Sequence, residues 1–284
     1  MNEGQPSRTA LSAAAARAAH PLVDDRPLIF TDPLAPRLLG GLADEMIGYH
    51  RSNGGHIILA GTRTVTTVRS RYAEARAGAF GQYAILGAGL DTYAFRAPAG
   101  RRVFEADHPA TQEWKRGLLD AAGIPVPEHA SLVPVDFEAP DGPVRPLAAA
   151  GLDTARPALV SWLGVAYFLT RDAVAGTLAE IGRLAPGTEL VMDYALPPGL
   201  RDADGDAYAE IAARVVRDSG EPSRTWFAPD EVNALLKDHG FDVVENLTLE
   251  RAVPPRAWRR TDALRPFDYF RLVRAVVTGR PVTG

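Results

Sequence analysis

The chain has 284 residues, a formal net charge of −4 and no cysteine. The absence of cysteine excludes disulfides, thiolate metal sites and cysteine nucleophiles. The slightly acidic balance and the short apolar runs argue against a nucleic-acid surface and against a membrane span. The amino terminus lacks the basic-then-apolar order of a signal peptide, so we expect a soluble, cytoplasmic protein of enzyme size.

Three helices are expected within the first eighty residues. Residues 9–19 are rich in alanine, which has the highest helix propensity. Asp32-Pro33 opens a short second helix, which Gly40-Gly41 ends. A further helix is expected over 62–79, and it carries four arginines: Arg63, Arg69, Arg71 and Arg76.

From residue 82 onward the sequence alternates between strand and helix patterns. Strands are expected over 83–87, 102–106, 131–136, 157–163 and 188–194, with helices between them over 109–122, 144–150 and 171–184. Such alternation predicts an α/β fold with a parallel sheet covered on both faces. After residue 195 we expect two helices and two strands, over 207–217, 229–239, 241–247 and 270–277. The simplest division is one domain over 1–284, with a helical cap or lid over 1–80 and a Rossmann-like core over 81–284.

The most informative segment lies between the first two expected strands. The apolar run 83–86 leads into Gly87-Ala88-Gly89, and Asp107 follows about twenty residues later at the end of the second strand. Glycines let the backbone approach a ligand closely, and a carboxylate at the tip of the next strand accepts hydrogen bonds from ribose hydroxyls. The pattern therefore indicates a site for an adenosine-like ligand. A dinucleotide fold would have a third glycine where Thr92 stands, which disfavours an NAD(P)-dependent oxidoreductase.

Beyond this motif, the chain resembles the leucine carboxyl methyltransferase family. These are class I methyltransferases that use S-adenosyl-L-methionine, and they include polyketide carboxyl O-methyltransferases. The resemblance covers nearly the whole chain, and it is carried by Asp32-Pro33-Leu34-Ala35, Arg69-Ser70-Arg71-Tyr72, Leu86-Gly-Ala-Gly-Leu-Asp-Thr92, Phe104-Glu-Ala-Asp-His-Pro109, Val135-Asp136-Phe137, Trp162-Leu-Gly-Val165, Gly220-Glu221-Pro222 and Gly240-Phe241. It implies a seven-stranded, mostly parallel sheet with an antiparallel last strand.

The resemblance assigns a site for S-adenosyl-L-methionine and its product S-adenosyl-L-homocysteine. Arg69 would pair with the methionine carboxylate, with Arg71 as the alternative, because a guanidinium binds a carboxylate in a bidentate manner. The backbone of Gly87-Ala88-Gly89 would approach the ligand. Asp91 would either contact the methionine amine or only cap a helix.

Further positions follow from the same resemblance. Asp107 would bind the ribose hydroxyls, while Glu105 is expected on the opposite face of its strand as a buried partner of an arginine. Asp136, at the end of the third strand, would accept the adenine amine, and Phe137 would pack beside it. Leu163 stands where the family has a glutamate, so any contact there must come from backbone or apolar packing. This departure makes the protein-phosphatase substrate of the eukaryotic branch doubtful.

The acceptor is expected to be a small molecule. A carboxylate acceptor needs no general base, whereas a hydroxyl acceptor does. His108 is the one histidine beside a motif, and we expect it to begin a helix. A carboxylate of a secondary metabolite is therefore favoured, a phenolic or alcohol hydroxyl of a polyketide-like compound is the alternative, and a non-catalytic cofactor-binding protein stays open. Tyr167 is expected to position the acceptor, and the other acceptor-side candidates are Tyr194, Arg224, Trp226, Tyr49, His50 and Arg63.

Overall fold

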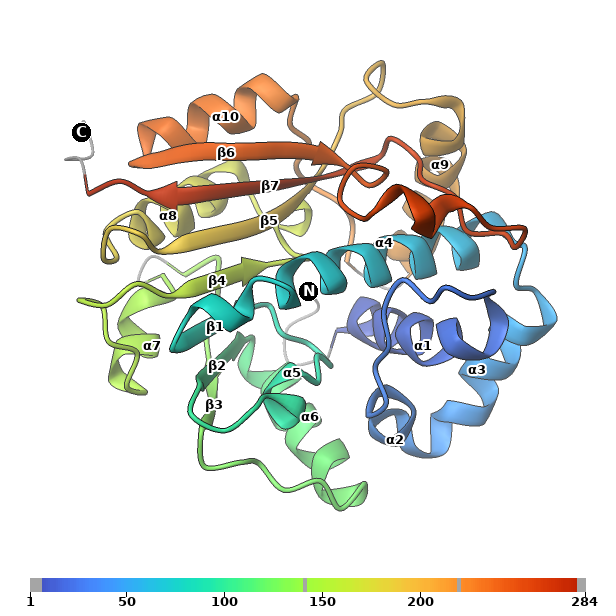
Figure 1. The fold of residues 1–284 in the computed structure, drawn as a ribbon, viewed down its shortest axis with the longest axis horizontal. Helices are drawn as coiled ribbons and strands as arrows, with labels where there is room; N and C mark the ends of the chain where they lie inside the picture. The colour runs from blue at the N-terminus through green and yellow to red at the C-terminus, as the bar shows by residue number, and fades with distance from the viewer. Residues whose placement is uncertain (1–6, 140–141, 219–220, 280–284) are drawn as a thin grey trace.

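The structure, a computed structural model, describes residues 7–139, 142–218 and 221–279. Its centre is a seven-stranded sheet with the order β3-β2-β1-β4-β5-β7-β6 (Figure 1). The strands are β1 (Gln82–Leu86), β2 (Arg102–Asp107), β3 (Ala130–Pro134), β4 (Leu159–Trp162), β5 (Glu189–Ala195), β6 (Phe241–Thr248) and β7 (Phe270–Val277). Strands β1 to β5 pair in parallel, and β7 runs antiparallel to both of its neighbours. The expected mostly parallel sheet with an antiparallel last strand is confirmed.

Helices precede, connect and flank these strands. They are α1 (Arg8–Val23), α2 (Ala35–Leu39), α3 (Ala43–Ser52), α4 (Ile57–Glu74), α5 (Tyr93–Arg96), α6 (Pro109–Ala121), α7 (Val144–Ala149), α8 (Arg171–Ile181), α9 (Ala203–Asp218) and α10 (Pro229–Asp238), with short 3-10 turns η1 (Gly40–Leu42), η2 (Ala77–Ala79), η3 (Ala166–Phe168) and η4 (Pro255–Trp258). Helix α3 was not expected from the sequence. Within the described residues, no helix combines the length and the apolar character that a membrane crossing requires.

Both faces of the sheet are covered, which is why β1 and β5 are buried along their whole length. On one face, Phe104 and Trp162 pack with Leu178 of α8. On the other face, Tyr83 and Ile85 pack with Val68 of α4. Helix α4 is therefore part of a layer on the sheet, and it crosses in front of the strands in Figure 1.

The first helices gather at the carboxyl ends of the parallel strands. In Figure 1 the arrowheads of β4 and β5 point toward the side of the molecule where α1, α3 and α9 lie. A buried ion pair within the cap is hydrogen-bonded to the loop after β1: Arg17 Nε lies 2.9 Å from Asp32 Oδ2, and Arg17 Nη2 donates to the Leu90 carbonyl at 2.6 Å. Asp32 Oδ1 also accepts from the Thr92 hydroxyl at 2.6 Å. Each buried charge thus has hydrogen-bond partners, as burial requires.

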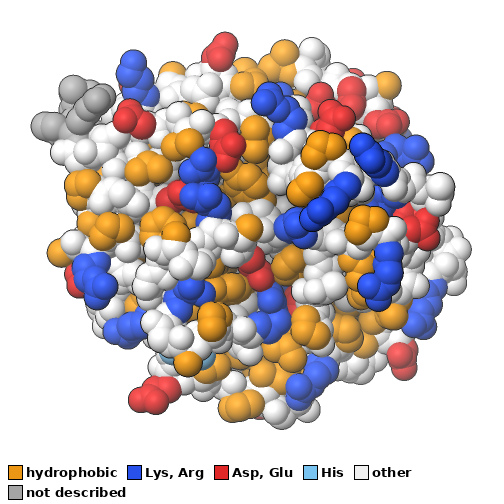
Figure 2. Space-filling model, in the orientation of Figure 1, with side chains coloured by type: hydrophobic (Ala, Val, Ile, Leu, Met, Phe, Trp, Pro, Cys, Tyr) orange, Lys and Arg blue, Asp and Glu red, His pale blue; other side chains and the backbone are white. Residues whose placement is uncertain are grey.

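The surface carries charges of both signs. On the face shown in Figure 2, basic and acidic side chains are interspersed between apolar ones. This mixture agrees with the small net charge of −4.

Candidate active site

A cavity of about 920 Å³ lies at the carboxyl ends of the strands. The leading cofactor-binding candidates and Tyr167 line it: Arg69, Gly87, Ala88, Gly89, Asp91, Asp107, Asp136, Phe137, Leu163 and Tyr167. The loops after β1 to β4 and helix α4 bring these residues together. The cavity continues into the cap, where it is lined by α1, α3, α4 and α9.

The loop after β1 is shaped by its two glycines. Gly87 has a φ of 67° and Gly89 a φ of 48°, a conformation that side chains disfavour. A Cβ atom on Gly87 would lie 2.1 Å from Val165 Cγ2, and one on Gly89 would lie 2.8 Å from the Ala10 Cβ. The N–H groups of Gly87 and Ala88 both donate to the Ala106 carbonyl, at 2.7 and 3.2 Å. The loop is therefore fixed by the neighbouring strand and leaves bare backbone at the cavity.

Asp107 joins this loop to the end of β2. Its Oδ2 accepts the Gly89 N–H at 2.6 Å, and its Oδ1 accepts the His108 N–H at 2.7 Å. Burial raises the pKa of Asp107, and these two backbone donors oppose the rise. Each carboxylate oxygen still has a lone pair for a ligand hydroxyl, because an ionised carboxylate has about four acceptor sites.

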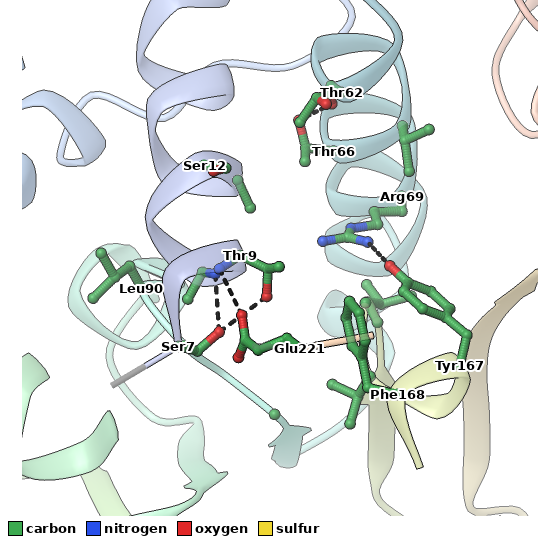
Figure 3. A pocket seen from close by; sticks show the side chains of 18 of the residues that line it. Ser7, Thr9, Ser12, Thr62, Thr66, Arg69, Leu90, Tyr167, Phe168 and Glu221 are labelled. Carbon is green, nitrogen blue, oxygen red and sulfur yellow. Dashed lines mark hydrogen bonds between the residues drawn. The ribbon is translucent and has the colours of Figure 1, made fainter. Parts of the chain in front are cut away.

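Arg69 reaches the cavity from α4 (Figure 3). Its Nη1 donates to Asp193 Oδ2 at 3.0 Å and to the Tyr167 hydroxyl at 3.4 Å. Asp193 Oδ1 in turn accepts the Gly164 N–H at 2.6 Å. Nε and Nη2 of Arg69 make no hydrogen bond within the described parts of the chain, so these donors are left for a ligand.

The sequence analysis did not identify Asp193 as a partner of Arg69, although the sequence contains a pattern that indicates it. It stands in the middle of β5 and is 1% exposed. The alternation of a strand places Asp193 on the same face as Val191, which packs in the core cluster that contains Val68 of α4. A carboxylate on the face that meets an arginine-bearing helix is a signal for an ion pair.

The remaining predicted cofactor residues surround the same space. Asp91 Oδ1 accepts the Tyr93 N–H at 2.7 Å just before α5, although the N-cap residue of that helix is Thr92, while Oδ2 has no hydrogen bond to the described residues. Asp136 is exposed and lies two residues beyond β3, which ends at Pro134 rather than at residue 136. Phe137 is buried with its ring centroid 6.4 Å from that of Trp162.

Several expectations outside the core motifs are corrected. Glu105 pairs with Lys115, not with an arginine. It also stands two residues before Asp107 in β2, so the two carboxylates belong to the same face of the strand. Tyr194 is fully buried away from the cavity and donates to Asn246 Oδ1 at 2.8 Å. Trp226 lines a separate hollow.

The structure also shows where His108, Arg224 and Arg71 lie. His108 begins α6, where its side chain accepts the Ala110 N–H, so the helix-start prediction is confirmed. Arg224 lines the cavity. Arg71, the alternative to Arg69, does not line the cavity and donates to the Ile29 carbonyl at 3.0 Å.

Glu221 contributes a contact that the sequence did not reveal. Its Oε2 accepts the Thr9 N–H at 3.0 Å, which ties the segment after α9 to the first turn of α1 (Figure 3). Gly220, the preceding residue of the resemblance motif, lies outside the described residues.

These features fit a sulfonium nucleoside. The glycine loop lines the cavity with backbone, the Asp107 carboxylate has acceptor sites that ribose hydroxyls could use, and Arg69 has unused donors that could bind a carboxylate. A cavity of about 920 Å³ is at the upper end of the range for ligand pockets, which leaves space for a second molecule.

Comparison with known families decides the assignment. The family model for leucine carboxyl methyltransferase matches residues 10–182. The chain belongs to the leucine carboxyl methyltransferase family. YktD of Bacillus subtilis, named as a candidate S-adenosyl-L-methionine-dependent methyltransferase, is 31% identical over 307 aligned residues, which cover 97% of this chain and 99% of that protein. A protein of Streptomyces coelicolor with the same kind of name is 30% identical, over 88% of each chain. Members of this family are methyltransferases, and this chain is therefore a methyltransferase that uses S-adenosyl-L-methionine.

Solved structures agree on the fold. A methyltransferase candidate from Thermobifida fusca has a TM-score of 0.59 and 18% identity, and the match covers 98% of this chain and 97% of that one. A DUF574 family protein from Streptomyces avermitilis has a TM-score of 0.57 and 17% identity, covering 93% and 97%. At this level of identity the likeness supports the class I methyltransferase fold of the family and nothing further.

Proposed function

We propose that this methyltransferase forms the methyl ester of a small-molecule carboxylic acid, a secondary metabolite. S-adenosyl-L-methionine supplies a methyl group on a positively charged sulfur that departs as a neutral thioether. The acceptor oxygen must therefore be a nucleophile. A carboxylate is already ionised at neutral pH, so no group of the protein has to remove a proton from it.

The state of Tyr167 is the observation that carries the carboxylate proposal. Burial and the nearby Asp193 raise the pKa of the Tyr167 hydroxyl above its ordinary range. The hydroxyl thus stays protonated and cannot act as a base at neutral pH. Its oxygen accepts from Arg69, so its hydrogen is free to be donated to an acceptor. One carboxylate oxygen can take that hydrogen bond while the other is methylated.

His108 does not supply the missing base. Its Nδ1 accepts the Ala110 N–H at 3.3 Å as the cap of α6, which holds the ring at the helix start. Glu45 and His56 line the cavity but are exposed, at positions in the cap open to solvent. The placement of these three groups favours an acceptor that arrives ionised.

The cofactor roles in this proposal follow from the contacts already described. The free N–H groups of Arg69 bind the methionine carboxylate, Asp107 binds the ribose hydroxyls, and Asp136 with Phe137 receives the adenine. Asp91 Oδ2 is available to the methionine amine. Leu163 contributes apolar packing beside the methyl group that is transferred.

In the same proposal, the helices of residues 1–80 serve as the lid over the acceptor. The cap end of the cavity includes Met46 of α3, Leu59 of α4 and Ile211 of α9. Apolar walls remove water from a carboxylate, which strengthens it as a nucleophile and positions it against the methyl group. A cytoplasmic location belongs to the proposal as well, in keeping with the absence of cysteine.

The type of bond formed tests the proposal. The purified protein is incubated with S-adenosyl-L-methionine labelled in its methyl group and with small-molecule extracts of bacterial cultures freed of macromolecules. Methyl esters release their label as volatile methanol in mild base, whereas methyl ethers do not. We expect base-labile label in a small molecule, and none with the Asp107→Ala variant. Base-stable label would indicate a hydroxyl acceptor, and label retained on protein would contradict a small-molecule acceptor.

A further inference from the structure

A series of buried hydrogen bonds connects residues of the cap and ends at His50, which lines the cavity. It begins at the Ile29 N–H, which donates to His20 Nε2 at 3.0 Å. Because that nitrogen accepts, the His20 proton is on Nδ1, and Nδ1 donates to Asp24 Oδ2 at 2.8 Å. Each step in this part of the series therefore has one possible direction.

Arg63 continues the series from Asp24 to His50. Its Nε and Nη2 donate to the two Asp24 oxygens at 2.8 and 3.0 Å, and Nη2 also donates to the Gly54 carbonyl at 2.7 Å. Its Nη1 lies 3.1 Å from His50 Nδ1. Arg63 is fully buried, and a guanidinium has no acceptor atom. His50 Nδ1 must therefore accept.

This contact fixes the protonation of the His50 ring. With Nδ1 as an acceptor, the neutral ring carries its proton on Nε2. Burial and the charge of Arg63 lower the pKa of His50 to about 4, against a smaller opposite effect of Asp24. His50 is 4% exposed, it lines the cavity, and no described residue hydrogen-bonds its Nε2. At neutral pH, His50 is a neutral donor with a fixed orientation.

His50 lies in the cap, away from Arg69 and Tyr167, beside which the proposed methyl transfer takes place. Arg63, its partner, precedes Arg69 by six residues on α4, which is about 9 Å along the helix axis. Met46, on the same helix as His50, also lines this end of the cavity. An acceptor with its reacting carboxylate near Tyr167 would bring a distant part of its skeleton to His50.

We propose that the Nε2–H of His50 is a binding subsite for an oxygen atom in the distal part of the methyl acceptor, such as a ketone, ester or second carboxylate. The inference rests on the proposed function and deepens it, because it specifies the substrate as an acid with a remote oxygen that accepts hydrogen bonds. His50 acts in positioning and specificity. It cannot serve as a base through Nε2, because that nitrogen already bears the proton.

Two probe acids test the subsite on the complex with S-adenosyl-L-homocysteine. 8-Oxononanoate and nonanoate share a chain length and a carboxylate, and they differ in one ketone oxygen that can only accept. We expect the wild-type protein to bind the keto acid about five- to tenfold more tightly in calorimetry, the gain from one hydrogen bond. Equal affinities, or no saturable binding of the keto acid, would overturn the inference.

Two variants of His50 separate the subsite from a structural role. In His50→Asn, the side-chain oxygen can still accept from Arg63, but no donor reaches the cavity. In His50→Gln, the longer amide can place an N–H where Nε2 was. The preference for the keto acid should disappear in the asparagine variant and persist in the glutamine variant, with the affinity for S-adenosyl-L-homocysteine unchanged in both. A preference that survives in His50→Asn would contradict the inference.

A measurement on the unaltered protein keeps the inference testable if a variant does not fold. Nitrogen-15 NMR of the histidine rings distinguishes the two tautomers. A neutral ring with the proton on Nε2 at pH 7 is expected, and a charged ring or a proton on Nδ1 would overturn the inference. Failure of the proposed function can be distinguished from failure of the subsite. If the keto acid binds through His50 but no carboxylate is methylated, the subsite is supported and the esterification proposal is wrong.

Discussion

Replacing Gly87 with alanine tests whether the loop after β1 is as crowded as its geometry indicates. At a φ of 67°, a side chain costs about 1–2 kcal/mol relative to glycine. The new Cβ would also lie 2.1 Å from Val165 Cγ2, and making room in a packed region costs about 1–3 kcal/mol. Together these effects should lower the free energy of unfolding by about 2–5 kcal/mol.

Val165→Ala is the matched control for this change, because it removes Cγ2 but leaves the backbone of Gly87 untouched. In the double variant of Gly87→Ala and Val165→Ala, the cost of the steric clash should be relieved, and the cost of a side chain at positive φ should remain. Urea unfolding of the two single variants and the double variant should therefore show a favourable coupling of about 1–3 kcal/mol. Affinity for S-adenosyl-L-homocysteine should fall in Gly87→Ala and recover in part in the double variant. Strictly additive energies would refute the assignment of a contact between this loop and Val165.

Two further changes address the buried charges of the site and the cap. Asp193→Asn should lower the free energy of unfolding by about 3–5 kcal/mol, because Arg69 is left in a buried site without its counter-ion; a loss below 1 kcal/mol in urea unfolding would speak against this pairing. The pKa of His50 is about 4 in the folded chain and about 6.5 when unfolded, so its contribution to stability is complete above pH 6.5 and is lost as the pH falls toward 4. Lowering the pH from 7 to 5 should therefore destabilise the wild type by about 2 kcal/mol more than His50→Gln, and equal losses would show that the ring titrates normally.

The sequence was most informative about the sheet. Strand–helix alternation from residue 82 predicts parallel pairing, because a strand covered on both faces is apolar throughout and a helix must return the chain to the same edge. The antiparallel direction of β7 followed from the family resemblance and not from the residues, and its place between β5 and β6 was not predicted. Helix α3 was missed because it contains Gly48 and its residues are mostly polar, and both features weaken the helix pattern in the sequence.

For the candidate site, the residues beside strand ends were predictable and the supporting contacts were not. Gly87 and Asp107 are read from short motifs, because each follows a strand whose end must face the ligand. The contacts of Arg63 with Asp24 and His50 join three separate helical segments of the cap, and no local pattern encodes such pairing. Glu105 shows the opposite failure: its burial was expected, but the identity of its partner depends on how α6 packs.

The central claim is that the loop at Gly87–Gly89 and the carboxylate of Asp107 hold the nucleoside of the methyl donor. Calorimetric titration of the wild type and of Asp107→Asn with S-adenosyl-L-homocysteine tests it directly. The wild type should bind one molecule per chain and should not bind NADH. The variant should bind about 10- to 100-fold more weakly, the cost of ribose hydroxyls and a loop N–H left without their acceptor. Equal affinity in the two proteins, or binding of NADH in place of the homocysteine, would contradict the account.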